Sequence, residues 1–79
     1  MSRYTKELED DRIVAWGYDT ALGYFIDVLG AEDDQGIRET LIEESSFLTK
    51  MSNGKMLELM SIFELPEDHI EKVAMDLKF

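Results

Sequence analysis

The stretch Arg12–Leu29 constrains the fold of this chain more than any other. It holds four of the eight aromatic residues and the only tryptophan. Its β-branched and aromatic side chains favour extended backbone. Between its two halves lies Asp19–Gly23, which combines a residue that starts turns with a glycine that can adopt positive φ. The stretch therefore predicts a β-hairpin with strands at Arg12–Tyr18 and Gly23–Leu29.

Alternation along these two strands gives each of them two faces. The first strand places on opposite faces the sets Val14, Trp16, Tyr18 and Ile13, Ala15, Gly17. The second strand separates Tyr24, Ile26, Val28 from Phe25, Asp27, Leu29. Because an unpaired buried carboxylate is costly, Asp27 marks its face as the solvent side. The pairing register decides which of these faces adjoins Trp16, and the sequence leaves that register open.

The segment after the hairpin is harder to interpret. Gly30–Gly36 is a loop by composition, with glycines on either side of an acidic centre. We expect a short third strand near Glu39–Glu44, because a hairpin alone is marginally stable. An irregular turn through Ser45–Lys50 would follow it. A helix over residues 37–51 is the alternative.

Two amphipathic helices are predicted at the C-terminal end. The first covers Ser52–Glu64, and the second begins at Pro66, since a proline ends one helix and suits the first turn of the next. Their apolar stripes follow the i, i+3, i+4, i+7 spacing of helices, with members Met56, Leu59, Met60, Phe63 and then Ile70, Val73, Ala74, Leu77.

The expected fold class is therefore α+β. It comprises a small antiparallel sheet, made of the N-terminal β-hairpin plus a short third strand, covered on one face by two C-terminal helices. Residues 12–79 form the single small domain. Residues 1–11 are expected to be a mobile acidic tail, because Tyr4 and Leu8 are their only apolar anchors after Met1.

Charge narrows the range of partners. Eighteen acidic residues face eight basic ones, giving a formal net charge of −10. Such a surface repels nucleic acids and anionic membranes and attracts basic proteins. The chain has no cysteine, no apolar run of about 18 residues, and no apolar leader in its first residues. We therefore expect a soluble cytoplasmic protein that binds a protein partner.

Motifs for catalysis or for cofactors are missing from the sequence. His69 is the only histidine, and no nucleophile motif accompanies it; a solvated helix residue is the simpler interpretation. An EF-hand register with Gly36 at its sixth position places Ala31 and Ile42 where acids are required. Glu43 and Glu44 would point to opposite faces of a strand, so they do not form a joint acid–base site. We expect no catalytic residue, metal or cofactor.

The candidate binding residues combine aromatic and acidic side chains. If the hairpin aromatics lie together on the outside, they form an interaction patch; otherwise they fill the core. With the acids of the hairpin and of the following loop, the predicted partner-binding set is Trp16, Tyr18, Phe25, Asp27, Glu32, Asp33 and Asp34.

These features favour a small acidic, non-catalytic protein-binding or regulatory module of the adaptor or inhibitor type. In the inhibitor form, carboxylates would imitate phosphates towards a basic groove. The alternative is a structural subunit of a homo-oligomer such as a homodimer, in which the hairpin edge or the apolar face is buried between copies. An enzyme using His69 is the least favoured hypothesis, because a domain of this size has little room for a cleft.

Overall fold

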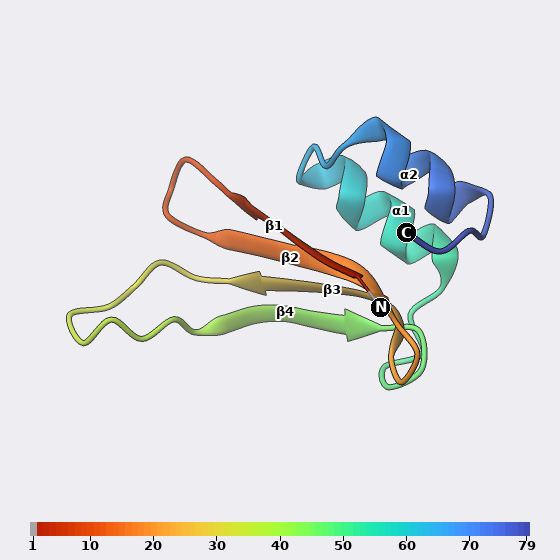
Figure 1. The fold of residues 1–79 in the computed structure, drawn as a ribbon. Coiled ribbons are helices and arrows are strands. Elements are labelled where there is room, and N and C mark those ends of the chain that lie inside the picture. Colours follow the sequence, from red (N-terminus) through yellow and green to blue (C-terminus); the bar gives the residue numbers. More distant parts are fainter. Residues whose placement is uncertain (1) are drawn as a thin grey trace.

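The computed structural model describes residues 2–79 and confirms the α+β class. The elements are β1 (Ser2–Glu7), β2 (Ile13–Asp19), β3 (Gly23–Leu29), β4 (Thr40–Ser45), α1 (Asn53–Ile62) and α2 (Glu67–Ala74). The strands form one antiparallel sheet in the order β1-β2-β3-β4, and the two helices lie on one of its faces (Figure 1). The sheet is open, so β1 and β4 are both edge strands.

The register of the hairpin settles which faces meet. Val14 pairs with Val28, Trp16 with Ile26, and Tyr18 with Tyr24. This inner face packs against the helices. The core comprises Val14, Trp16, Tyr24, Ile26, Val28, Met51, Met56, Leu59, Met60, Phe63, Leu65 and Val73. Asp27 lies on the opposite, outer face, as its charge predicted.

The N-terminal segment differs from the mobile tail that the sequence predicted. Ser2–Glu7 forms the edge strand β1 along β2. Tyr4 turns towards the helices and packs 4.4 Å from the His69 ring and 6.0 Å from the Trp16 ring, between ring centres. Lys6 donates hydrogen bonds of 3.0 Å to the carbonyls of Phe63 and Glu64, which lie just after the last turn of α1, where a cation is favoured. The segment is held by distant residues and not by its own polar sequence.

The helices lie within the predicted ranges. Ser52 caps α1 by accepting a hydrogen bond from the Lys55 N–H, and the whole predicted stripe of α1 is buried. The stripe of α2 is shorter than expected. The helix ends at Ala74, and Asp76 adopts a φ of 58°, so Leu77 leaves the stripe and is 47% exposed.

The third predicted strand is confirmed as β4, one residue later than expected. Its pairing with β3 is irregular between Val28 and Leu29, because Ile42 pairs with Val28 and Thr40 with Leu29. Leu41 is the extra residue of this bulge and is 50% exposed. The predicted irregular turn follows β4 and closes on Ser45, whose carbonyl accepts hydrogen bonds from the N–H groups of Thr49 and Met51.

Candidate interaction surface

The outer face of the sheet, opposite the helices, carries an unusual pair of carboxylates. The cross-strand row through its centre is Thr5, Ala15, Asp27 and Glu43. Asp27 on β3 and Glu43 on β4 are therefore directly opposite each other on the same face. Like charges in this position destabilise a sheet, so the sheet tolerates this pair at a cost.

The environment of Asp27 opposes its ionisation. Burial is the main cause that raises the pKa of the Asp27 carboxyl above its ordinary value. The positive charge of Arg3 lowers this pKa, and the negative charge of Glu43 raises it further. The net result is a raised pKa, so the ionised form of Asp27 is less stable here than in water. A cation placed beside Asp27 and Glu43 would relieve this strain.

A hollow beside this pair combines an apolar ring with acids. Its volume is about 190 Å³, and it is lined by Leu22, Phe25, Asp27, Glu43, Glu44, Ser45, Leu48 and Thr49. We call it the acidic notch. Phe25 is buried, and its ring has the guanidinium carbon of Arg3 5.7 Å from its centre. Leu48 is 70% exposed at the rim. An apolar floor with carboxylates at the edge suits a side chain with an aliphatic stem and a cationic end.

The hairpin aromatics do not form the patch considered from the sequence. Trp16 and Tyr18 lie on the inner face, whereas Phe25 lies on the outer face. Trp16 is only 3% exposed, and its Nε1–H donates a 3.0 Å hydrogen bond to His69 Nδ1. Of the predicted aromatic residues, Phe25 alone lines the acidic notch.

His69 is not the solvated helix residue that the sequence suggested. It is half-buried and stacks on the Phe79 ring, with ring centres 5.1 Å apart and planes at 5°. Its Nδ1 accepts a hydrogen bond from the Trp16 indole N–H. This arrangement uses His69 to satisfy a buried indole N–H and to join α2 to the sheet.

The acids of the β3–β4 loop lie away from the acidic notch and shape their own loop. Asp33 Oδ1 accepts hydrogen bonds from the N–H groups of Gln35 and Ile37, which lower the pKa of the Asp33 carboxyl, the Ile37 bond most. The Glu32 carboxylate forms an ion pair with the Arg38 guanidinium at 3.4 Å. Asp34 is exposed. The predicted set is therefore divided among three places: Phe25 and Asp27 line the notch, the three acids lie in this loop, and Trp16 and Tyr18 lie on the inner face of the sheet.

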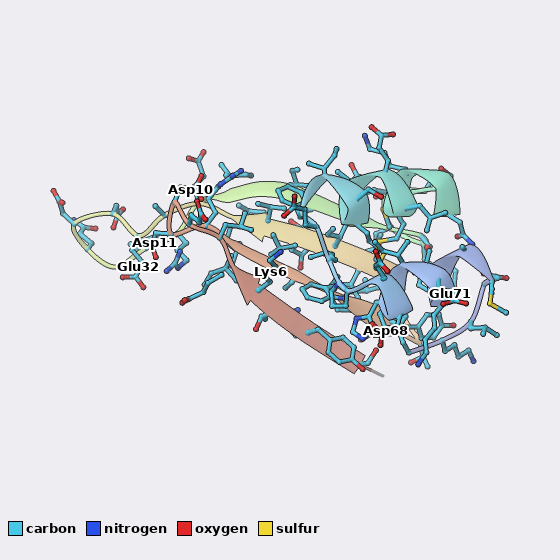
Figure 2. The ribbon with its side chains drawn as sticks, turned by 90° about the horizontal axis from the view of Figure 1, so that it is seen from above. Lys6, Asp10, Asp11, Glu32, Asp68 and Glu71 are labelled. Atoms are coloured by element: carbon cyan, nitrogen blue, oxygen red, sulfur yellow. The ribbon has the colours of Figure 1, made fainter. Side chains whose placement is uncertain are left out.

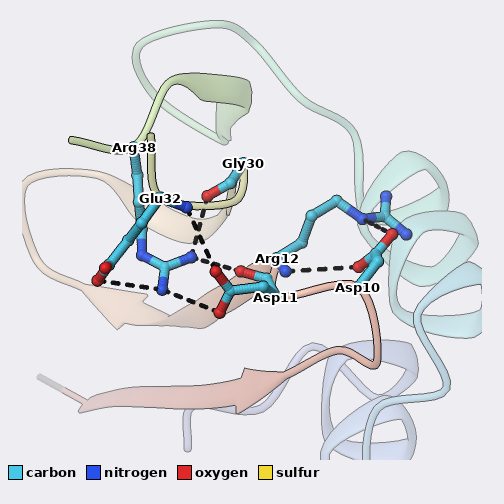
Figure 3. A network of polar contacts seen from close by, with 6 residues as sticks. All are labelled: Asp10, Asp11, Arg12, Gly30, Glu32 and Arg38. Atoms are coloured by element: carbon cyan, nitrogen blue, oxygen red, sulfur yellow. Dashed lines mark hydrogen bonds and ion pairs between the residues drawn. The ribbon is translucent and has the colours of Figure 1, made fainter. Parts of the chain in front are cut away.

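Arg38 ties the loop to the β1–β2 turn (Figure 3). Its guanidinium donates to the carbonyls of Asp11 and Gly30 and pairs with the carboxylate of Asp11 at 3.3 Å. Arg38 is only 16% exposed. Arg38 therefore connects the β1–β2 turn to the β3–β4 loop, and Asp11 and Glu32 are its carboxylate partners.

A second hollow lies on the helix side of the sheet. It measures about 580 Å³ and is lined by Lys6, Glu7, Leu8, Glu9, Asp10, Arg12, Ile62, Phe63 and Glu64. Its cations are already engaged: Lys6 with the carbonyls after α1, and Arg12 with Asp10 at 2.7 Å. Figure 2 shows Lys6 between the acids at the sheet tips and those of α2. The acids of this hollow, Glu7, Glu9 and Glu64, form no ion pair among residues 2–79, but none of them faces another acid across paired strands as Asp27 and Glu43 do.

Sequence reasoning missed Glu43 and Leu48 as notch residues. Their position depends on the β3–β4 register and on the turn that folds back after Ser45, where the Leu48 N–H donates to Ser45 Oγ at 3.1 Å. Glu44 does point away from Glu43 across the strand, as expected, and accepts a 2.7 Å hydrogen bond from Thr49 Oγ1. Alternation from Asp27 could have identified the outer face of β3, but it could not have identified Glu43 as the residue opposite Asp27 on β4.

Within residues 2–79, no group of three or more His, Asp or Glu side chains is arranged to hold a metal ion. No helix in the same range is long and apolar enough to cross a membrane.

The fold and this surface define a small α+β protein with an open four-stranded antiparallel sheet, covered on one face and acidic on the other. No protein family, no curated protein and no solved structure matches the chain.

A pH-dependent stability follows from Asp27. Its folded-state pKa lies above the unfolded value, so the folded state binds more protons between those two values. The stability cost is absent below the unfolded pKa, grows as pH rises from that value through the folded pKa, and is complete above the folded pKa. Asp27→Asn should therefore raise the free energy of unfolding at pH 7. Solvent screening at this half-buried site limits the gain to about 0.5 kcal/mol.

Urea unfolding at several pH values, followed by Trp16 fluorescence, measures this gain. Asp34→Asn is the matched control, because it makes the same chemical change at a carboxylate that is exposed in the loop. We expect the stability difference between Asp27→Asn and the natural chain to vanish at acidic pH. A variant less stable than the natural chain at pH 7 would contradict this assignment.

Proposed function

We propose that this chain is a non-catalytic protein-binding module whose outer sheet face receives a basic partner. The observation that carries the proposal is the Asp27–Glu43 pair, two opposed carboxylates beside an apolar notch. A protein surface that keeps such a pair loses stability, and that loss is typical of residues retained for function. A lysine or arginine of a partner would neutralise both charges and place its stem against Leu48, the exposed apolar side chain at the rim.

Charge at long range supports the same partner. The net charge of −10 attracts basic proteins and speeds their encounter at low salt. A module of this kind fits an adaptor or an inhibitor that covers a basic site on its target.

The homo-oligomer alternative is favoured by the two open sheet edges, which can pair with a second copy. Two copies that each carry ten net negative charges repel one another, so a basic partner is the stronger proposal.

Partner capture with matched charge variants tests the proposal. Tagged natural chain, Asp27→Asn/Glu43→Gln and Asp68→Asn/Glu71→Gln are each used to capture proteins from native lysate, with elution along a salt gradient. The third variant removes the same charge from exposed residues of α2 on the opposite layer (Figure 2). We expect a partner retained by the natural chain and by the α2 variant, but weakened at least about tenfold in the outer-face variant. Equal loss in both variants, or no loss in either, would contradict the site.

A further inference from the structure

The free edge of β4 adjoins the acidic notch and has unpaired backbone. The Ser45 N–H points away from β3, since it donates to Thr49 Oγ1 at 2.9 Å, and the next N–H, that of Ser46, reaches the Tyr24 carbonyl at 2.9 Å. Backbone direction alternates along an antiparallel strand. The N–H and carbonyl of Glu43, two residues before Ser45, therefore face outward at the open edge.

The turn after β4 leaves only a short part of this edge open. Thr49 and Met51 donate to the Ser45 carbonyl and so close the end of the strand. The bulge at Leu41 interrupts the regular ladder at the other end. An added strand would therefore meet β4 around Glu43, next to the carboxylates of the notch.

From this geometry we infer that the partner segment binds as a fifth strand on β4, with a lysine or arginine opposite Glu43. This inference rests on the proposed function and specifies the form of the partner. The added residue would extend the row Ala15, Asp27, Glu43 by one position. Cross-strand neighbours of opposite charge stabilise a sheet, and backbone hydrogen bonds supply affinity in strand addition.

Charge favours a basic partner segment over a second copy of this chain as the strand added to β4. Antiparallel pairing of two β4 strands would bring their Glu43 and Glu44 side chains close together, which like charge opposes. The basic residues of β1 are already engaged: Lys6 with the carbonyls after α1, and Arg3 beside the Phe25 ring. The other open edge, β1, carries Arg3 and Lys6, which would repel a basic segment.

A hexapeptide that alternates lysine and valine, acetylated and amidated, is the probe. Two further versions carry N-methyl groups, one on all lysine amides and one on all valine amides. Only one alternate set of amides can face β4 in an added strand, whereas both versions keep the same charge. We expect one methylated version to bind at least about tenfold more weakly and the other to bind like the parent peptide.

Two protein variants complete the test. Glu43→Pro removes the outward N–H together with the charge, whereas Glu43→Gln removes the charge alone. The proline variant should lose more affinity than the glutamine variant, with Trp16 fluorescence confirming that both are folded.

The outcomes separate this inference from the proposed function. Equal binding of both methylated peptides, with weaker binding to Asp27→Asn/Glu43→Gln, would overturn strand addition and leave the acidic surface standing. Absence of binding by the parent peptide at low salt would also overturn it, while the capture experiment judges the surface independently. Sedimentation equilibrium that shows a dimer of the natural chain, lost in Glu43→Pro, would assign the edge to a second copy.

Discussion

Trp16→Ala should cost about 3–5 kcal/mol of folding free energy, which is the usual range for truncating a buried tryptophan. The indole is 3% exposed and packs on the inner face beside Tyr4 and His69. The substitution also removes the N–H that His69 Nδ1 accepts. In a domain of this size that loss approaches the total stability, so the variant should be largely unfolded at 37 °C.

Thermal unfolding followed by far-ultraviolet circular dichroism measures this effect without the tryptophan signal. Trp16→Phe is the matched control, since it keeps an aromatic ring and loses mainly the indole volume and its hydrogen bond; we expect a cost of about 1–2 kcal/mol. A folded Trp16→Ala chain within about 1 kcal/mol of the natural one would contradict the placement of Trp16 in the core.

Gly17→Ala should detach the beginning of β1. A Cβ at this position would overlap the backbone carbonyl of Ser2 and would lie 3.1 Å from Phe25 Cζ. Backbone cannot move aside as a flexible side chain can, so β1 must shift away from β2. We expect a cost of about 1–3 kcal/mol, the range for forcing added atoms into a packed site, together with faster hydrogen exchange of the β1 amides.

Gly54→Ala is the control with the same chemical change. Gly54 lies in α1, and a Cβ there would meet nothing closer than Ser52 Oγ at 3.8 Å. Alanine favours helix over glycine by about 0.5–1 kcal/mol, so this variant should be more stable than the natural chain. A neutral Gly17→Ala substitution with β1 amides still protected would show that the two strands are not as close as the structure has them.

Local sequence pattern was sufficient to predict the strands and helices whose own residues show the expected periodicity. The charge of Asp27 marked its face of β3 as the solvent side, and the spacing of Met56, Leu59 and Met60 marked the buried side of α1. In each case the period of the apolar residues matches the period of the backbone. The face of β2 that the helices cover could not be predicted, because it depends on the β2–β3 register.

Contacts between distant residues decide the rest, and no local pattern reports them. β1 has a polar sequence and becomes a strand because Gly17 admits its backbone and because Tyr4 packs on His69. α2 stops at Ala74, and the Leu77 carbonyl instead accepts a 2.8 Å hydrogen bond from the Tyr24 hydroxyl. The bulge in β4 sets which acid faces Asp27, so only part of the notch could be predicted.

Stability and binding should respond in opposite directions at the outer face. Asp27 lowers stability in the free chain because burial and Glu43 oppose its charge. The same carboxylate would stabilise a complex with a cationic side chain. This opposition separates a binding residue from a structural one, since truncating a structural residue such as Trp16 lowers stability and binding together.

Site-specific photocrosslinking tests the central claim most directly. A photoreactive amino acid replaces Leu48 at the rim of the acidic notch in one variant and Ile62 at the other hollow in a second; both positions are highly exposed, at 70% and 61%. Irradiation in the native cell should then join a basic partner to position 48 and not to position 62. A crosslink at position 62 alone would place the partner on the helix side and contradict the outer-face site.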